Sequence, residues 1–404
     1  MTDVVQEISD WLIHRGLGTY DFEHVIGGFC EQLRASGMPL ARAMVAMRTL
    51  HPAIDAHSFI WRPGAELSVT DFGMDANPSA MFLASPLNHL LNHRDLYELR
   101  RPLTGPDAVV DFEILAELRD RGFTDYFIQK VPFTVTSGGR RPTGMLCSWT
   151  SDSPDGFGDR DLAVLRRLAL RLGLSVSNIL QREITLNVLD TYVGRDAGAR
   201  ILSGEIRRGS LREIDAVILY MDLRGFTALA DRNEGAVMAG LLNDYFERIV
   251  PEIVDRGGEV LKYMGDGILA TFNLEGRDEA ATCSVGLDAA IAALRGVESW
   301  NAEREAAGEE TMALDVAVHL GRVLYGNVGA ANRLDFTVIG AAVNEASRLE
   351  TLCDDLDRHL VISGTFAAAA TRCTARLVSL GRHALRGVRD EQEVFTVDYR
   401  GAAA

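Results

Sequence analysis

The 404-residue sequence lacks the usual marks of a secreted or membrane-spanning protein. Its five cysteines are scattered, odd in number and form no CxxC pair, which favours free thiols in a reducing compartment. No basic stretch followed by an apolar one opens the chain, so we expect no secretory signal. No apolar run approaches the roughly 18 residues that a membrane span needs. These absences predict a cytoplasmic protein with no membrane partner.

The sequence is also poor in positive charge, and it lacks several common nucleotide-site motifs. Against 57 acidic residues stand 41 Lys and Arg, a formal net charge of -16. Such a surface repels phosphate backbones, so nucleic-acid binding is not expected, although local cations and a metal ion could still hold one nucleotide. The sequence contains no GxxxxGK[ST], no GxGxxG after a strand, no HExxH and no GxSxG. A nucleotide site would therefore have to be built another way.

The N-terminal half mixes apolar helices with strand-like runs. Residues 126–133 and 144–150 read as neighbouring strands across the turn-rich segment 136–140. From 158 to 193, apolar residues recur at steps of three and four, which predicts one long connecting helix. Two interpretations of that helix stay open: a coiled-coil seam between two chains, or packing on its own domain.

From about residue 213 the pattern becomes that of an α+β domain. A near-continuous apolar run at 216–221 predicts a buried strand, and a helix follows with an apolar face from Val237 to Ile249. Two apolar strands around Gly265-Asp266-Gly267 predict a hairpin. Further helices are expected at 277–295 and 342–352, and further strands at 314–320 and 334–339. Helices and hairpins in this order do not form a regular βαβα series.

Two aspartates stand at the ends of these predicted strands. Asp222 ends the buried strand and Asp266 lies at the tip of the hairpin. Each alone is typical of a turn or a helix cap. If the hairpin pairs beside the buried strand, however, the two carboxylates converge at one sheet edge and suit Mg²⁺, with the carbonyl of Leu223 as a third ligand.

Five other residues are candidates for a nucleotide site, but each also has a simple structural explanation. Lys262, on the first hairpin strand, could extend to solvent. Thr337 is a common strand residue, and Arg322 follows a strand. Asn344 and Arg348 lie four apart on a predicted helix and so share one face, where such pairs are often only surface residues.

Residues 213–400 resemble the catalytic domain of class III adenylyl and guanylyl cyclases. The resemblance rests on three ordered motifs, at 221–227, 261–272 and 337–350. It implies a ferredoxin-like βαβ core with antiparallel hairpins. It also implies that Asp222 and Asp266 bind two Mg²⁺ or Mn²⁺ ions. The chain departs from the common pattern at Ala341, often acidic, and at Glu345, often apolar; neither is a catalytic position of the family.

The same resemblance implies roles for the remaining candidates. Lys262 and Thr337 match the pair that reads the purine, while Asn344 and Arg348 match the residues that stabilise the transition state. Arg322 matches an arginine that contacts the phosphates, and Arg386 or Arg389 could replace a lysine at the terminal phosphate. In the family the metal aspartates and Arg322 come from one chain and the purine and transition-state residues from its partner, which implies a homodimer.

The resemblance extends more weakly to the N-terminal half, which is similar to GAF-type sensory domains. We expect a GAF-like sensory domain over 1–180 with an unidentified small-molecule ligand, a helical linker over 181–212 and a cyclase domain over 213–404. The expected activity is conversion of ATP to cyclic AMP. A guanylate cyclase and a catalytically silent nucleotide-binding or dimerisation module are the alternatives.

Overall fold

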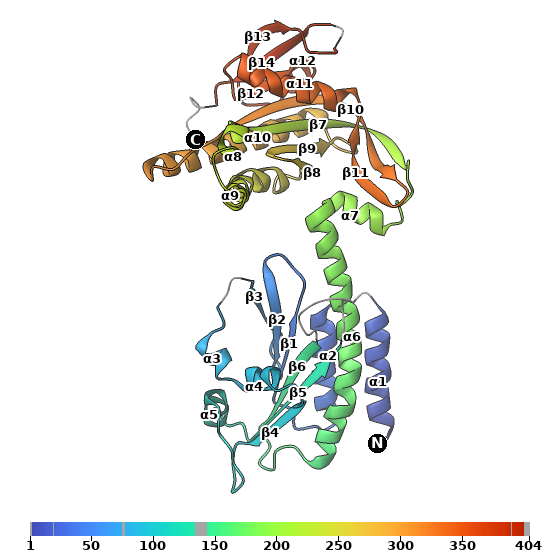
Figure 1. The fold of residues 1–404 in the computed structure, drawn as a ribbon. Coiled ribbons are helices and arrows are strands. Elements are labelled where there is room, and N and C mark those ends of the chain that lie inside the picture. The colour runs from blue at the N-terminus through green and yellow to red at the C-terminus, as the bar shows by residue number, and fades with distance from the viewer. Residues whose placement is uncertain (1, 19, 75–76, 134–143, 389, 400–404) are drawn as a thin grey trace. The chain divides into compact units, whose positions relative to one another are not determined.

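The chain divides into two compact units, Met1–Val188 and Leu189–Ala404, each described here by itself. A computed structural model describes residues 2–18, 20–74, 77–133, 144–388 and 390–399 (Figure 1).

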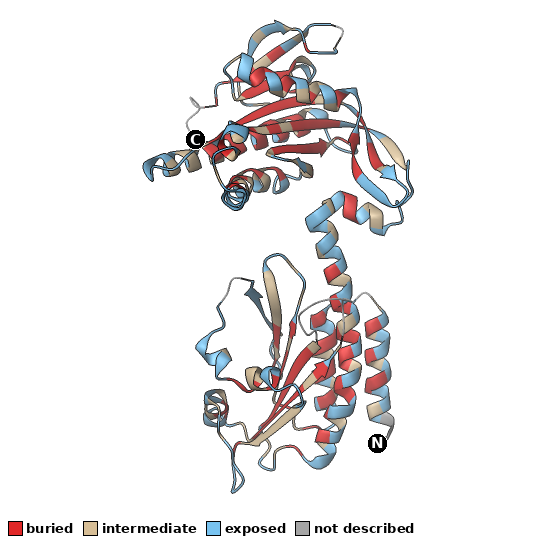
Figure 2. Cartoon of the chain, viewed as in Figure 1, coloured by how far each residue is buried: buried red, intermediate tan, exposed pale blue. Residues whose placement is uncertain are grey.

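A six-stranded antiparallel sheet forms the centre of the N-terminal unit, in the order β3-β2-β1-β6-β5-β4. The elements of this unit are α1 (Thr2–Leu17), α2 (Phe22–Ala35), β1 (Arg42–Arg48), β2 (Ile54–Trp61), β3 (Ser68–Gly73), α3 (Ala80–Leu83), α4 (Pro86–Asn92), β4 (Glu98–Pro102), α5 (Glu113–Asp120), β5 (Asp125–Pro132), β6 (Gly144–Ser151) and α6 (Asp159–Val193). The expected pairing of β5 with β6 is confirmed, and the turn between them lies outside the described residues. Helices α1, α2 and α6 share a core with one sheet face, while α4 and α5 contribute to a smaller core on the other (Figure 2).

Helix α6 fulfils the prediction of one long helix, but its apolar stripe does not form a coiled-coil seam. Leu162, Leu165, Leu168 and Leu172 are buried in the core that α6 shares with α1, α2 and the sheet. The same core takes in Val176, Ile179 and Leu180. Because these side chains are buried in the core of the N-terminal unit, this part of α6 packs on its own domain, as the second interpretation predicted.

A second sheet, of eight strands, forms the centre of the C-terminal unit. Its order is β13-β14-β12-β10-β7-β9-β8, with β11 paired to β10. The elements are α7 (Arg195–Leu202), β7 (Leu211–Arg224), α8 (Phe226–Ala230), α9 (Gly235–Val254), β8 (Glu259–Met264), β9 (Gly267–Asn273), α10 (Glu279–Ala306), β10 (Ala313–Ala330), β11 (Arg333–Ile339), α11 (Ala341–Asp355), β12 (Leu360–Ser363), α12 (Gly364–Ala369), β13 (Leu377–His383) and β14 (Gln392–Val397). The predicted α+β class and the β8–β9 hairpin are confirmed.

The alternation of side chains along β7 sorts them onto two sheet faces. Val217, Leu219 and Met221 pack with α9 and α10 in the main core. Ala216 and Ile218 face the other way, into a core that includes β11 and α11. Asp222 follows the second set in this alternation, so it lies on the α11 side of the sheet. One detail of the α9 prediction was wrong, because Val237 is 57% exposed rather than part of the apolar face.

Helix α10 alone among the described helices is long and apolar enough to cross a membrane by length and composition. Half of its most apolar window is buried, and its side chains Cys283, Leu287, Ala290 and Leu294 belong to the main core. This burial matches a core helix that packs on the sheet. The helix is longer than predicted and extends to Ala306.

Candidate active site

The two predicted metal carboxylates come together in the C-terminal unit. Strand β7 pairs with β9 up to Met221–Ile268, so Asp222 lies next to the hairpin loop Gly265-Asp266. A two-residue loop with Gly265 at φ +72° is the tight geometry expected for such a hairpin. A side chain at Gly267 would lie 3.1 Å from the Asp222 Oδ1 atom. Glycine at that position therefore leaves room for the Asp222 carboxylate beside the loop.

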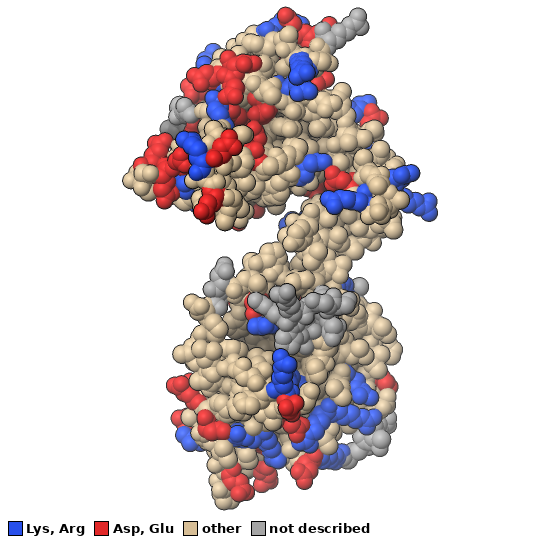
Figure 3. Space-filling model, in the orientation of Figure 1, with Lys and Arg blue, Asp and Glu red and all other residues tan. Residues whose placement is uncertain are grey.

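Burial and negative charge both act on this pair. The pKa of Asp222 is raised to about 6, first by burial and then by the charges of Asp266, Asp315 and Asp354. Burial also raises the pKa of Asp266. Neither carboxylate forms an ion pair among the described residues, and Arg224, two residues after Asp222, pairs instead with Asp315 and Asp354. In Figure 3, Asp and Glu side chains gather over the end of this unit where α8 and α10 lie in Figure 1.

Three neighbours of Asp222 were not predicted from the sequence. Asp315 is its cross-strand partner on β10, and the Arg224 Nε atom lies 2.7 Å from the Asp315 Oδ2 atom. Glu350, on α11, has its pKa raised to about 7 by burial and by the charges of Asp222, Asp315 and Asp354, while Arg224 opposes this shift. The sequence signal for Glu350 was its place at the end of the third motif, two residues after Arg348.

The purine-reading candidates are also brought close together. Lys262 donates a hydrogen bond from Nζ to Asp335 Oδ2 at 3.0 Å, and Asp335 lies two residues before Thr337 on β11. Thr337 is 3% exposed and its Oγ1 atom has no hydrogen-bond partner among the described residues. A buried hydroxyl without a partner is an unfavourable arrangement that a bound ligand can correct. Asp335 was missed, although its spacing from Thr337 puts both residues on one face of the strand.

Asn344 and Arg348 lie on α11 as predicted. Both are exposed, because the helix packs on the sheet through Ala342, Ala346 and Leu349. The unusual Glu345 also has a structural partner, His319 on β10, whose Nε2 atom lies 3.6 Å from the Glu345 Oε2 atom. Burial lowers the pKa of His319 to about 4, so this contact joins a neutral imidazole to Glu345 near pH 7.

Arg322 does not join the two aspartates within one protomer. It pairs across the β7–β10 ladder with Asp215, and its Nε atom lies 3.1 Å from the Asp215 Oδ1 atom. Asp215 and Asp222 are seven residues apart on β7, about 23 Å of strand, and side chains an odd number of residues apart face opposite sides. The assignment of Arg322 to the same half-site as Asp222 therefore stays a prediction.

Of the two C-terminal arginine candidates for the terminal phosphate, the structure describes Arg386. Arg386 is exposed in the turn after β13, directly after Leu385, which packs against Leu349 and Leu352 of α11. It thus lies beside the helix that carries Arg348. Arg389 lies outside the described residues.

The carboxylate pair fits a divalent cation better than any side-chain cation of the same protomer. Two partly buried carboxylates without a counter-charge suit Mg²⁺ or Mn²⁺, which take further ligands from water and phosphates. The described residues contain no group of three or more His, Cys, Asp or Glu side chains arranged to hold a metal ion. The Leu223 side chain is buried in the core, so only its backbone carbonyl could serve as a third ligand.

Comparison with known proteins gives the family of this unit. The family described as "Adenylate and Guanylate cyclase catalytic domain" matches residues 211–398. Residues 211–398 therefore form a class III cyclase catalytic domain. The match begins at β7, so the GAF-like character of 1–180 stays a prediction.

The relatives of this cyclase domain are larger proteins. An adenylate cyclase of Anabaena cylindrica is 34% identical over 163 residues, which cover 39% of this chain and 31% of that protein. An uncharacterized protein of Mycobacterium tuberculosis is 32% identical over 208 residues, which cover 51% of this chain and 37% of that protein. The chain thus spans about a third of the length of these curated relatives.

Two of the solved structures that resemble this chain match 46% of it. The adenylyl cyclase CyaB from P. aeruginosa is 23% identical with a TM-score of 0.43, covering 46% of this chain and 95% of that one. The guanylyl cyclase Cya2 is 25% identical with a TM-score of 0.41, covering 46% and 93%.

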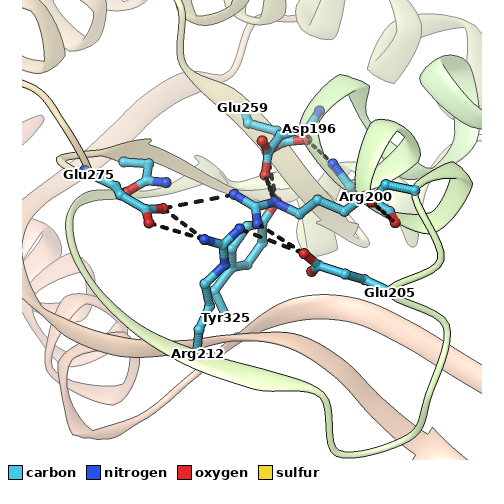
Figure 4. A network of polar contacts seen from close by, with 10 residues as sticks. Asp196, Arg200, Glu205, Arg212, Glu259, Glu275 and Tyr325 are labelled. Atoms are coloured by element: carbon cyan, nitrogen blue, oxygen red, sulfur yellow. Dashed lines mark hydrogen bonds and ion pairs between the residues drawn. The ribbon is translucent and has the colours of Figure 1, made fainter.

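A network of polar contacts fastens α7 to the sheet of the cyclase domain (Figure 4). The Tyr325 hydroxyl lies 2.9 Å from Asp196 Oδ2 and 3.0 Å from Glu259 Oε2. Glu259 Oε1 in turn accepts from the backbone N–H groups of Asp196 and Ala197, at the start of α7. Because Glu259 begins β8, which carries Lys262, the first turn of α7 is tied to a strand of the candidate site.

Proposed function

We propose that this chain is an adenylate cyclase that converts ATP to 3′,5′-cyclic AMP and pyrophosphate as a homodimer. The observation that carries the proposal is the pair of partly buried carboxylates, Asp222 and Asp266, in a class III cyclase domain, neither of which forms an ion pair among the described residues. A site of this charge is suited to metal-bound triphosphate. Bound Mg²⁺ or Mn²⁺ would supply charge compensation and a lowered pKa of the ribose hydroxyl.

The reaction is an intramolecular displacement. The ribose 3′-oxygen forms a bond to the α-phosphorus, the bond from that phosphorus to the bridging oxygen breaks, and pyrophosphate leaves while the hydroxyl proton passes to solvent. Asp222 and Asp266 would hold the metal ions that offset the charge of the triphosphate, Asn344 orients the ribose and Arg348 stabilises the charge that grows on the α-phosphate. Arg322 and Arg386 are assigned to the outer phosphates. No separate side-chain base is required.

Adenine rather than guanine is the base that suits Lys262 and Thr337. A lysine ammonium can donate to the adenine N1 acceptor, and a threonine hydroxyl can accept from the 6-amino group. Guanine presents a protonated N1 and a carbonyl O6, the reverse pattern. A buried polar mismatch costs about 1–3 kcal/mol, so we expect at least about a tenfold preference for ATP over GTP.

One assay of the purified chain tests this function. Equal ATP and GTP are supplied with Mg²⁺ or Mn²⁺, and cyclic AMP and cyclic GMP are measured. Cyclic AMP as the main product supports the proposal. Cyclic GMP as the main product would make the chain a guanylate cyclase, and neither product would leave a silent binding module.

We also propose that the N-terminal unit regulates turnover through α6 and α7. The support is the network of Figure 4, which ties α7 to β8 and β10. Signal transfer requires that a ligand bind two arrangements of the dimer unequally. Removal of residues 1–188, which leaves α7 and its contacts in place, should change turnover at saturating ATP by more than about threefold. Unchanged turnover in a folded, dimeric truncation would contradict this coupling.

A further inference from the structure

Three arginines converge on one face of the sheet in the N-terminal unit. Arg42 begins β1 and lies directly opposite Thr150 of β6, which in turn lies opposite Tyr126 of β5. Arg62 follows Trp61, the last residue of β2 and the partner of Ala43, so it continues the same row beside Arg42. Arg121 is the C-cap residue directly after helix α5, and its charge acts on Arg42. Cross-strand neighbours share a sheet face, so this row faces away from the core of α1, α2 and α6.

No carboxylate compensates these three charges. Among the described residues, none of the three guanidinium groups makes a hydrogen bond or an ion pair. The pKa of Arg42 is lowered by burial and by the charges of Arg62 and Arg121, and only Tyr126 raises it. Arg42 and Arg62 are half-buried like charges that repel one another and lose hydration, and the exposed Arg121 adds a third positive charge, so the arrangement is unfavourable without a counter-ion.

Other arginines of the same unit do have carboxylate partners. Arg100 Nη2 lies 2.7 Å from Asp125 Oδ2, and Arg101 Nη2 lies 2.7 Å from Asp111 Oδ2. Arg101 stands in the same row, opposite Tyr126. The fold therefore neutralises neighbouring arginines with its own carboxylates but leaves Arg42, Arg62 and Arg121 without one.

Two buried polar atoms within the row also lack partners. Thr150 is fully buried, and its Oγ1 atom makes no hydrogen bond among the described residues. The Nε atom of Arg62 is likewise buried and without a partner. Buried polar atoms in proteins are nearly always hydrogen-bonded, so each such atom calls for an explanation. A hydroxyl donor and guanidinium donors in one cross-strand row are the groups that an oxyanion accepts from.

We propose that Arg42, Arg62, Arg121 and Thr150 form a binding site for a small oxyanionic ligand in the N-terminal unit. The ligand carries a phosphoryl group or two or more carboxylates, because three guanidinium charges need more than one negative charge to balance them. Arginine forks suit both groups through paired N–H donors. Arg42 and Thr150 lie deepest, and the exposed Arg121 closes the site from α5.

Calorimetry on the purified full chain without divalent metal ions tests the site. Inorganic phosphate and citrate are the two probes, with acetate as the singly charged comparison and sodium chloride at matched ionic strength as the blank. Saturable binding of phosphate alone indicates a phosphoryl ligand, and binding of citrate alone indicates a polycarboxylate. Heats no larger than those of the chloride blank for both probes would overturn the proposal.

Charge-matched variants distinguish this site from general attraction of anions. Arg62→Gln and Arg121→Gln should each weaken binding about tenfold or more, as expected for a hydrogen bond to a charged group, and Thr150→Val should weaken it less. Arg119→Gln is the control, because Arg119 lies on the same helix and is paired with Asp120. Equal weakening by the control would contradict a built site.

Thermal unfolding without anion adds a second measurement, which does not depend on cyclase activity. Arg62→Gln removes an uncompensated charge and should leave the melting temperature unchanged or higher. Arg101→Gln breaks the ion pair with Asp111 and should lower it. Phosphate or citrate should then raise the melting temperature of the parent chain more than that of Arg62→Gln. A clear loss of stability in Arg62→Gln together with unchanged anion binding would show that Arg62 only supports the fold.

Discussion

At the scale of single residues, the chemistry of the cyclase domain depends on carboxylates that the fold places close to one another. Asp222 is partly buried beside Asp266 and opposite Asp315, and its pKa is raised to about 6. A raised carboxyl pKa means that the folded chain binds this proton more tightly than the unfolded chain does. The resulting loss of stability is absent below about pH 4 and complete above about pH 6. A divalent cation would reverse it.

Asp222→Asn should therefore stabilise the metal-free protein at pH 7.5. We expect a gain on the order of 1–2 kcal/mol in the free energy of unfolding, after allowance for partial exposure, and almost no difference near pH 4. Urea unfolding at both pH values measures it. Asp215→Asn on the same strand is the control, since Asp215 is exposed and paired with Arg322. Lower stability of Asp222→Asn at pH 7.5 would contradict the burial argument.

A second residue-level prediction concerns Asp335. The Lys262–Asp335 pair is partly exposed, with side-chain exposures of 32% and 60%, and such pairs contribute about 0–1 kcal/mol to stability. Asp335→Asn should leave the melting temperature nearly unchanged but reduce the preference for ATP over GTP, because Lys262 loses the group that orients it. Competition assays with both nucleotides measure the preference. A variant with unchanged preference would remove Asp335 from the base site.

The sequence predicted the ends of strands better than the contacts between them. Asp222 and Asp266 could be paired because an apolar run and a Gly-Asp-Gly turn fix where each lies. Asp335 and Glu350 could not be placed at the site from the sequence, because that requires long-range contacts. Asp335 depends on β11 lying beside Lys262, and Glu350 depends on α11 lying over β7. The uncompensated arginines of the N-terminal unit were missed for the same reason, since Arg42 and Arg62 meet through sheet register and Arg121 approaches Arg42 from the end of α5.

At the scale of elements, helices were predicted well where their apolar period was clear. Helices α6 and α11 begin and end within a few residues of the predicted limits. Periodicity alone could not say what the α6 stripe packs against, because core packing and a coiled coil both use steps of three and four. Helix α7 lies within the predicted helical linker, 181–212, but was not predicted as a separate helix, since it has only eight residues and follows an interrupting glycine.

That glycine, Gly194, should be essential to the junction between α6 and α7. Its φ of +95° is strained for any other residue, and an added Cβ would lie 2.6 Å from the Glu259 Oε1 atom that caps α7. Gly204 is a matched control, with φ +100° and no atom within 4 Å of an added Cβ. Gly204→Ala should cost about 1 kcal/mol from the backbone alone. Gly194→Ala should lower the free energy of unfolding clearly more than Gly204→Ala does, and it should alter turnover. Urea unfolding and a cyclase assay measure the two effects. Equal effects of the two substitutions would contradict the role of Glu259.

At the scale of the whole molecule, the proposed site needs two chains. One protomer brings Asp222 and Asp266 together but leaves Asn344 and Arg348 exposed on α11, and among the described residues Arg348 forms no ion pair with either aspartate. A closed two-fold dimer would present the α11 of each protomer to the carboxylates of the other and form two equivalent sites. Regulation by the N-terminal unit would then act on the geometry of that dimer.

Mixing two inactive variants tests this shared site. Asp222→Ala removes a metal ligand and Arg348→Ala a phosphate contact, so each homodimer should lose at least about 10³ in turnover. In a mixed dimer one site receives both intact residues and the other receives both defects. Random exchange makes about half of the dimers mixed, so activity should recover to about a quarter of the parent value. Co-expression with two different tags verifies that mixed dimers form. Confirmed mixed dimers that stay as inactive as the parents would mean that both residues act from one chain.

The same experiment with Arg322→Ala in place of Arg348→Ala assigns Arg322 to one half-site. The resemblance to class III cyclases puts Arg322 and Asp222 in one chain, so the mixture should not recover. The ladder register points the other way, because Arg322 lies seven positions from Asp222 and on the opposite sheet face. Recovery to about a quarter of the parent activity would therefore put Arg322 in the partner's half of the site. No recovery would require that the twist of β10 carries the Arg322 side chain back toward the triphosphate of its own chain.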